Sequence, residues 1–362
     1  MFITIFIFIA ILTILILVHE FGHFITAKWA GARVEEFGIG FPPRVFGLKK
    51  GETLYSVNLL PIGGFVKIYG EDGDKKNDTR SFASKPLRVR SSIIAAGVLM
   101  NIVLSVVLLS FGHFIGLPQV IDGSDVSGDI SNIVVRIAAI AQASPAHEAG
   151  IRVGDVIDAM QSEGMRLDTI QTIENVQEFT SGHIGKPVLL SMKRGGEVFE
   201  KTVVPRADPP TGEGAIGIAM IRTGQVSYPW YRAPLKGAES TFFLVRDTVK
   251  AFATIIMDYV STGALTEELA GPIGIAVITG QVQQLGFIFL LQFIALISIN
   301  LAIINILPFP ALDGGRLLFL AIEKLKGSPV NQKYEKFAHT VGFALIILLM
   351  ILVTFRDIGR FL

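Results

Sequence analysis

Long runs of apolar residues divide this chain of 362 residues, and four of them have the length of a membrane-spanning helix. About 20 apolar residues in helical conformation cross a ~30 Å hydrocarbon layer. Between these runs the pattern changes to short alternating segments with glycine and proline turns. We therefore predict a membrane α-helical bundle of four transmembrane helices with polar parts inserted between them. The four predicted spans are residues 2–27, 91–115, 285–308 and 338–355.

The basic residues predict how these spans are oriented. Twelve lysines and arginines lie between Lys28 and Arg90, and five more lie in the short connection after the third span, whereas none precedes the first span. Basic residues concentrate on the cytoplasmic side of membranes, so we expect both termini and residues 116–284 to be extracytoplasmic. The first apolar run lacks the basic start and small-residue cleavage site of a signal peptide, and we expect it to be retained.

Residues 45–70 predict a cytoplasmic β-hairpin layer. Short strands are expected from Val45 to Leu48, from Thr53 to Leu59 and from Phe65 to Tyr69, with turns at residues 49–52 and 61–64. An unpaired strand edge in this layer could receive an extended peptide by β-augmentation. The alternative is a loop that only caps the bundle.

Residues 133–206 predict a compact mixed domain of a strand, a short helix, a strand, a second helix and a final hairpin. Gly195-Gly196 suits the hairpin turn, Ser144 suits the N-cap of the short helix, and Gly150 suits its C-terminal end. This order of elements resembles a bacterial-type PDZ domain. We therefore expect an inserted α+β PDZ-like domain that either keeps proteins with bulky external parts away from the helix bundle, which we favour, or binds a newly exposed C-terminus.

From Tyr228 to Val260, aromatic and aliphatic residues mix with charged ones, which is typical of a helix lying along a membrane surface. The predicted organisation therefore has four parts. Residues 1–115 form the N-terminal membrane part, 116–226 the extracytoplasmic PDZ-like domain, 227–284 the interfacial amphipathic segment, and 285–362 the C-terminal membrane part.

Composition and charge narrow the possible chemistry. Hydrophobic residues make up 51% of the chain and charged residues 17%, as expected for membrane spans combined with a water-facing domain. The absence of cysteine excludes disulfides and thiolate ligands, so a metal must be held by His, Asp or Glu. With a net charge of +1 and no isolated basic run, we expect no nucleic-acid partner.

The first predicted span leads into a group of ionisable residues, His19-Glu20-Phe21-Gly22-His23. Two histidines at positions i and i+4 project from one face of a helix, so both imidazoles can reach a single zinc ion. The carboxylate of Glu20 can take a proton from zinc-bound water and pass it to the leaving amine. Ionisable groups within a span cost at least ~2–3 kcal/mol each, which indicates a compensating role. The alternative is that these side chains are merely solvated at the cytoplasmic end of the span.

A catalytic zinc takes three protein ligands and keeps a fourth position open. Without cysteine, the third ligand is an aspartate, a glutamate or another histidine, and Asp313 is the strongest candidate. Pro308 and Pro310 interrupt the helix before it, and Gly314-Gly315 permit a bend back toward the first span. The alternative is a helix-ending turn with a solvated aspartate. The histidines that we expect not to bind zinc are His113, His147, His183 and His339.

These two motifs, with Gly64-Phe65-Val66-Lys67 and a PDZ-like insertion between the second and third apolar runs, closely resemble the bacterial site-two proteases, which are intramembrane zinc metalloproteases. The resemblance covers nearly the whole chain. It implies that His19, His23 and Asp313 bind Zn2+. It also implies that Glu20 is the catalytic general base and acid.

The same resemblance implies that Asn305 lies near the substrate backbone. We also expect the hairpin residues Gly64, Phe65, Val66 and Lys67 to bind the substrate. It implies substrates that are single-span membrane proteins, such as anti-sigma factors or signal-peptide remnants, usually trimmed first by another protease. It places the chain among membrane lipids in a bacterial inner (plasma) membrane, with the active site toward the cytoplasm. The chain departs from the family at Val98, where proline is usual, and it carries one PDZ-like domain where some relatives carry two.

Two rival functions remain open at this stage. A catalytically silent membrane scaffold would bind protein tails through its PDZ-like domain, and its function would survive the change Glu20→Gln. A metal transporter would need polar residues along a path across the bilayer, whereas this sequence gathers them at one end.

Overall fold

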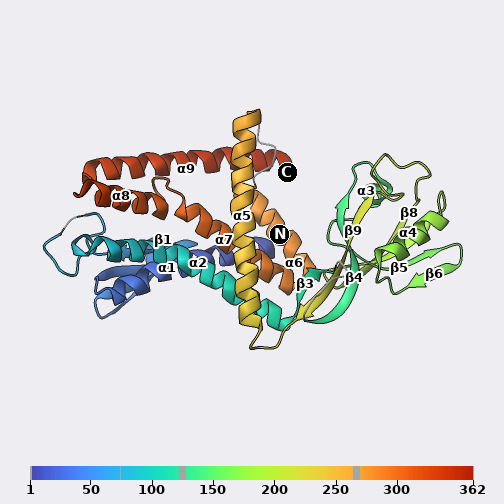
Figure 1. Cartoon of the computed structure of the whole chain (residues 1–362), viewed down its shortest axis with the longest axis horizontal. Coiled ribbons are helices and arrows are strands. Elements are labelled where there is room, and N and C mark those ends of the chain that lie inside the picture. The colour runs from blue at the N-terminus through green and yellow to red at the C-terminus, as the bar shows by residue number, and fades with distance from the viewer. Residues whose placement is uncertain (1, 74, 122–127, 264–269, 362) are drawn as a thin grey trace. The chain divides into compact units, whose positions relative to one another are not determined.

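The apolar runs form long helices. The computed structural model describes residues 2–73, 75–121, 128–263 and 270–361, and within them four helices are long and apolar enough to cross a membrane. Each overlaps one predicted span, and α7 is apolar on every side, as expected of a helix surrounded by lipid or by other apolar helices. In Figure 1 they are α1 (Phe2–Trp29), α2 (Leu87–Ile115), α7 (Phe287–Ile306) and α9 (Gln332–Phe361).

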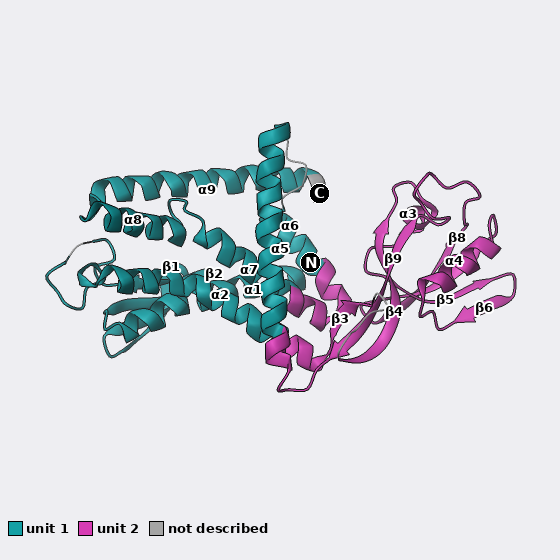
Figure 2. Ribbon diagram, in the orientation of Figure 1, with its two compact units in different colours: residues 1–109, 237–280, 293–362 teal, residues 110–236, 281–292 magenta. Residues whose placement is uncertain are grey.

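The chain divides into two compact units, coloured separately in Figure 2. The first consists of Met1–Leu109, Gly237–Gly280 and Phe293–Leu362, and the second of Ser110–Lys236 and Gln281–Gln292. All of the predicted catalytic, metal-binding and substrate-binding residues belong to the first unit. The fold of that unit therefore positions the candidate site.

The connection from α1 to α2 contains a two-stranded antiparallel sheet of β1 (Val34–Lys50) and β2 (Thr53–Ile68). The β-layer prediction is confirmed, but the predicted turn at residues 61–64 is wrong, because these residues belong to β2. Both strands bend, so that residues 34–39 pair with 64–68 on one side, and residues 36–39 also pair with 54–57 on the other. Segment 64–68 is thus paired on one side only and forms an edge of the sheet.

A small apolar core joins this sheet to the helices around it. Ala27 of α1, Val34 of β1 and Ile68 of β2 are buried together with Phe82, Ile93 and Leu320. Phe82 begins the short 3-10 helix η1 (Phe82–Ser84), and Leu320 lies on α8 (Asp313–Lys326), a helix that the sequence pattern did not predict. Arg90 of α2 also forms a bidentate salt bridge with Glu323 of α8, with N–O distances of 2.6 and 3.1 Å. These contacts fix α1, the β-layer, α2 and α8 against one another.

Residues 233–262 form one helix, α5 (Ala233–Thr262), which is not among the four candidate spans. The helix is as predicted, and its place at a membrane surface stays a prediction. The following α6 (Pro272–Leu285) was not predicted. Its start is held by Asp357 of α9, which accepts backbone N–H groups from Gly271 at 3.2 Å and Gly274 at 2.7 Å.

The second unit contains a seven-stranded sheet with the order β3-β9-β4-β5-β7-β8, and β6 pairs with β5. The predicted hairpin is confirmed: Gly195 and Gly196 join its strands with φ angles of 55° and 92°. Ser144 caps the short helix by accepting the N–H of His147 at 3.2 Å. The elements are β3 (Leu117–Val120), β4 (Asp129–Ile140), α3 (Pro145–Glu148), β5 (Val156–Ser162), β6 (Met165–Asp168), α4 (Ile173–Gly182), β7 (Val188–Arg194), β8 (Glu197–Val203) and β9 (Ile218–Ser227).

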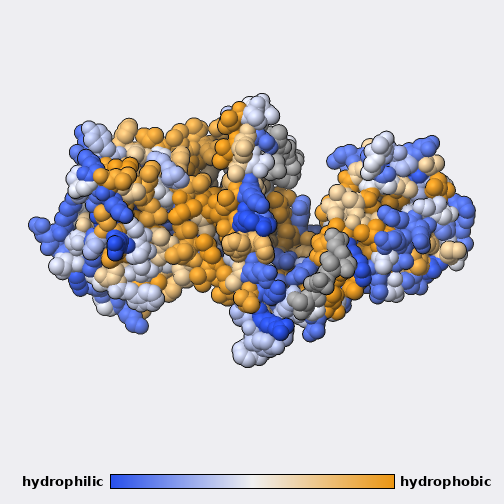
Figure 3. Space-filling model, in the orientation of Figure 1, coloured by the Kyte–Doolittle hydropathy of each residue, from blue (hydrophilic) through white to orange (hydrophobic). Residues whose placement is uncertain are grey.

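Figure 3 shows hydrophobic surface over the helices of the first unit. Several of these apolar side chains are exposed to the surroundings, among them Phe343 at 60%, Leu349 at 61% and Leu352 at 59% on α9. A continuous exposed surface of this kind would be unfavourable in water, whereas lipid tails can cover it. The surface thus agrees with the assignment of α9 as a span.

Candidate metal centre and active site

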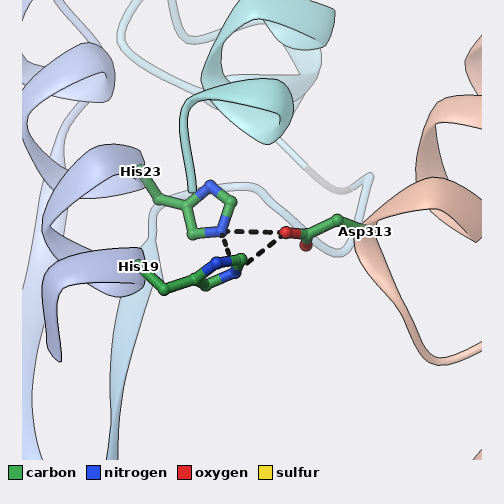
Figure 4. Close-up of side chains that lie close together, drawn as sticks. All are labelled: His19, His23 and Asp313. Carbon is green, nitrogen blue, oxygen red and sulfur yellow. Dashed lines mark hydrogen bonds and ion pairs between the residues drawn. The ribbon is translucent and has the colours of Figure 1, made fainter. Parts of the chain in front are cut away.

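Two histidines of α1 face the first residue of α8. His19 and His23 lie one helical turn apart, and both residues are buried, with exposed fractions of 6% and 8%. Their Nε2 atoms are 3.1 Å apart, and Asp313 Oδ2 lies 3.0 Å from His19 Nε2 and 3.2 Å from His23 Nε2 (Figure 4). The structure thus brings together the three residues that the two sequence motifs singled out.

Asp313 reaches the histidines because the chain between α7 and α8 turns sharply. Ala311 takes a left-handed conformation with φ 78°, and α8 begins two residues later. Gly314 and Gly315 do not supply the bend, since both are helical. They supply space instead: a Cβ on Gly314 would collide with the carbonyl oxygens of Ile306 and Leu307. The prediction of a bend was right, but the bend lies before Asp313.

The three donor atoms fit a zinc ion. Tetrahedral zinc with ligands at 2.0–2.1 Å separates its ligand atoms by about 3.3 Å, close to the distances among these atoms. His23 Nδ1 lies 2.8 Å from the carbonyl oxygen of Ile93, which can only accept a hydrogen bond. A neutral His23 therefore carries its ring proton on Nδ1 and presents a lone pair at Nε2. Asp313 Oδ2 has no well-formed hydrogen bond within the described structure. A metal ion would satisfy these converging lone pairs together.

The backbone of α2 packs directly against the two imidazoles. A Cβ added to Gly97 would lie 2.8 Å from His19 Cε1 and closer still to the ring of His23. Ile93, whose carbonyl oxygen contacts His23 Nδ1, lies on the same helix, α2. This contact resembles the outer hydrogen bond that orients most zinc-bound histidines. His19 Nδ1 and the side-chain amide of Asn101 are buried without a hydrogen-bond partner among the described residues. Sequence reasoning assigned no role to Gly97 or Ile93, because the effect of a close backbone contact depends on what packs against it.

Glu20 lies between the histidines and the edge of the sheet. Its Oε2 accepts the backbone N–H of Val66 at 3.0 Å. Val66 belongs to edge segment 64–68, whose other side pairs with β1, so this N–H points away from the sheet. One carboxylate oxygen of Glu20 is therefore oriented by the strand, and the metal-binding candidates lie beside it.

A cavity of about 500 Å³ adjoins these groups. Its walls come from α1, β2, α2, α8 and α9 together with the segment before α8, so the site is assembled from parts far apart in the sequence. The residues that line it are Glu20, His23, Phe65, Val66, Ile68, Glu71, Phe82, Ile93, Ile94, Ala311, Asp313, Arg316, His339, Thr340 and Phe343.

Only some of the predicted substrate-binding residues line this cavity. Phe65 and Val66 line the cavity. Gly64 packs against α1, where a Cβ would lie 2.9 Å from Leu17 Cδ2. Lys67 forms an ion pair with Glu35 at 2.9 Å, and this contact raises the pKa of Lys67. Asn305, in the last turn of α7, does not line this cavity.

Of the four histidines expected not to bind zinc, His339 is the one that lines the cavity. Its Nδ1 accepts the N–H of Ala311 at 2.8 Å. His147 and His183 belong to the second unit, as does His113. No spacing pattern along the sequence connects His339 with Ala311, which lies 28 positions earlier and meets it only in the folded chain.

Two histidines one turn apart, a carboxylate from a distant helix and an adjacent glutamate, set among apolar helices, define a membrane zinc metalloprotease. The model of peptidase family M50 matches residues 7–349, and the chain belongs to this family. It is a zinc metalloendopeptidase with Zn2+ as cofactor, and a multi-pass bacterial membrane protein. The resemblance to site-two proteases is thereby confirmed.

Relatives match over almost their whole length. A zinc metalloprotease of Clostridium perfringens is 38% identical, covering 95% of each chain. The zinc metalloprotease RasP of Geobacillus kaustophilus is 32% identical over 98% of this chain and 97% of its own. The regulator of sigma-W protease RasP of Bacillus subtilis is 31% identical over 99% and 98%.

Among solved structures, the PDZ domain of an SdrC-like protein from Listeria innocua matches 24% of this chain and 92% of its own, with 20% identity and a TM-score of 0.20. A score this low has no bearing on the fold. The PDZ-like description of the second unit continues to rest on its own order of strands and helices.

Proposed function

We propose that this protein cleaves single-span membrane proteins within, or at the edge of, the lipid bilayer, with His19, His23 and Asp313 holding zinc and Glu20 acting as general base and acid. The observation that carries the proposal is the convergence of His19 Nε2, His23 Nε2 and Asp313 Oδ2 beside Glu20 in a unit built of apolar helices. Ionisable groups in such surroundings are costly unless they have a function.

A zinc ion held by His19, His23 and Asp313 would supply Lewis-acid chemistry, polarising the scissile carbonyl and activating the attacking water. Glu20 would take a proton from the attacking water and deliver it to the leaving amine. The N–H of Val66 holds Oε2 of Glu20 at 3.0 Å, which leaves Oε1 to handle the proton. Burial of both histidines keeps bulk water from competing for their ring nitrogens.

The edge of β2 is suited to hold the substrate. A helical substrate has its backbone carbonyls engaged in hydrogen bonds, so it must be extended before hydrolysis. Segment 64–68 is paired on one side only, and its free side faces Glu20 through Val66. An extended substrate segment would add to this edge as a further strand, with Phe65 and Val66 forming part of the cavity wall. Asn305 has the proposed role of contacting the substrate backbone nearby.

We assign anti-sigma factors or signal-peptide remnants as the substrate class, because the relative from Bacillus subtilis is named a regulator of sigma-W protease. Membrane lipids surround the exposed apolar faces. We place the chain in the bacterial inner membrane with both termini and the PDZ-like domain extracytoplasmic, and with the active site toward the cytoplasm. The PDZ-like domain then excludes substrates that carry bulky external domains.

The change Glu20→Gln tests the proposed chemistry. We expect the purified variant to retain the zinc content of the wild type and to lose cleavage of a single-span substrate by at least about 100-fold, since general-base catalysis contributes 10²–10⁴-fold. Glu178→Gln, on the exposed surface of α4, is the matched control and should cleave normally. Equal cleavage by wild type and Glu20→Gln would contradict the role of Glu20. A Glu20→Gln variant that retains full function in cells would support the membrane scaffold instead.

A further inference from the structure

The segment that presents Asp313 is held in an unfavourable backbone conformation. Ala311, two residues before the carboxylate, has a φ of 78°. The left-handed region is unfavourable for a residue with a Cβ, and alanine has no polar side chain to offset that cost. Some contact outside the segment must therefore hold it.

His339 of α9 makes that contact. Its Nδ1 accepts the N–H of Ala311 at 2.8 Å, which means that the ring proton lies on Nε2. Nε2 is buried and has no partner among the described residues, so the bond to Ala311 is the one hydrogen bond of this ring there. The ring is partly buried, and its one hydrogen bond among the described residues goes to the segment that carries Asp313.

Two further contacts hold the ring and the segment together. The ring of Phe319, on α8, lies 5.5 Å from that of His339 between centroids. Gly342, three residues further along α9, packs against the backbone of Pro310 so closely that a Cβ would collide with the Pro310 carbonyl oxygen. The same face of α9 thus contacts consecutive residues of the turn, at Pro310 and at Ala311.

We propose that His339 is a positioning residue for the metal centre: its Nδ1 holds Ala311 in the left-handed conformation that points Asp313 at His19 and His23. The inference rests on the proposed function in taking Asp313 as a zinc ligand. It assigns no contact between His339 and the metal or the substrate. Without the acceptor, the N–H of Ala311 loses its partner, the turn relaxes, and the carboxylate moves away from the two histidines.

The test compares two variants of His339, one that removes the hydrogen-bond acceptor and one that keeps an acceptor in its place. In His339→Phe the ring remains but the acceptor is lost, whereas in His339→Asn the side-chain oxygen occupies roughly the position of Nδ1. Loss of an outer hydrogen bond weakens metal binding by about 10- to 100-fold. We therefore expect full-length His339→Phe in detergent to release zinc to a chelator at least about tenfold faster than wild type, and His339→Asn to stay within about threefold.

A second substitution separates positioning from general damage to the fold. Glycine adopts a φ of 78° without steric cost, so Ala311→Gly should restore slow zinc release to His339→Phe. The absorption spectrum of the cobalt-substituted protein reports ligand geometry, and it should change in His339→Phe and recover in the double variant. Phe337→Ala, at a 70% exposed position on α9, is the control and should match wild type in both measurements.

The outcomes distinguish the two proposals. If Asp313→Asn and His19→Ala lose zinc while His339→Phe retains it with wild-type kinetics and spectrum, the positioning role is wrong and the ligand set stands. If Asp313→Asn retains wild-type zinc affinity, the ligand set itself is wrong, and the role of His339 falls with it. Failure of both His339→Asn and Ala311→Gly to restore zinc binding would also overturn the positioning role.

Discussion

At the scale of single residues, the proposed metal centre depends on glycines, whose missing side chains leave space, as much as on the histidines and the aspartate. Gly97 of α2 leaves the space that the rings of His19 and His23 occupy. Gly22, on α1 between the two histidines, allows the backbone of Ala96 to approach so closely that a Cβ there would collide with its carbonyl oxygen. Glycine serves here for close helix contact and not for backbone freedom, because both residues are helical.

The change Gly97→Ala tests this packing. Its methyl group would overlap the imidazoles, so we expect the helices to separate, with about 1–3 kcal/mol of lost stability and at least tenfold weaker zinc binding. Thermal unfolding and zinc titration in detergent measure the two effects. Gly359→Ala, in α9 with no atom within 4 Å of the added carbon, should be neutral or slightly stabilising. Wild-type zinc affinity in Gly97→Ala would show that α2 does not confine the histidines.

At the scale of elements, short contacts at strand edges and helix ends control the site. The N–H of Val66, on the free edge of β2, orients Glu20. Asp313 is the first residue of α8, where the positive end of the helix dipole favours a carboxylate. The start of α6 lies against Asp357, which is 3% exposed and belongs to the distant α9.

The change Val66→Pro removes the N–H that reaches Glu20 at a strand edge, where proline is tolerated. We expect zinc content to be preserved and kcat to fall roughly 10- to 100-fold, since misplacing a catalytic group by about 1 Å has effects of this size. Val66→Ala keeps the N–H and serves as the control. Unchanged kcat in Val66→Pro would mean that this hydrogen bond does not orient the base.

The changes Asp357→Asn and Asp357→Ala test the cap on α6. The carboxylate of Asp357 accepts hydrogen bonds from two buried backbone N–H groups. Their loss in Asp357→Ala should lower the free energy of unfolding by about 2 kcal/mol. Asp357→Asn keeps one acceptor oxygen and should cost less. Chemical denaturation in detergent provides the comparison, with the neighbouring exposed Arg356→Ala as control. Equal stability of Asp357→Ala and wild type would rule out a structural role for this cap.

At the scale of the whole molecule, the inserted sheet has a complete core of its own. The side chains of Ile157, Met160 and Leu190 are almost fully buried within it, and its core cluster draws on the second unit alone. The proposed metal centre draws on the first unit alone. The inserted domain can therefore be deleted without removing any residue of the proposed metal centre.

Removing residues 117–226 should leave the metal centre intact. Leu117 is the direct cross-strand partner of Val226, so the ends of the deletion lie about 5 Å apart and a short linker can join them. We expect wild-type zinc content, unchanged cleavage of substrates with short external segments, and new cleavage of substrates with bulky ones. Cleavage assays on a pair of substrates that differ only in the external domain provide the measurement. Loss of cleavage of both, with zinc retained, would favour peptide binding by the inserted domain.

Much of this protein could be predicted from local sequence, because the forces involved are local. Apolar runs of sufficient length predicted the four long helices, since a helix satisfies its backbone hydrogen bonds internally in any apolar surroundings. The spacing of His19 and His23 determined that their rings share a face, whatever the rest of the fold. The Gly195-Gly196 turn and the Ser144 cap were likewise predictable from their immediate neighbours.

Tertiary structure alone decided which distant groups complete the site. Asp313 could be named as a candidate, but its 3.0 Å approach to His19 depends on the turn at Ala311 and on His339, which lies on another helix. The N–H of Val66 meets Glu20 only because β2 bends and presents an edge to α1. Backbone groups and missing side chains carry no periodic signal in a sequence, since their effect depends on what packs against them. The local pattern therefore determined the helices and the histidine pair, and the packing of α2, β2, α8 and α9 around α1 decided the rest of the site.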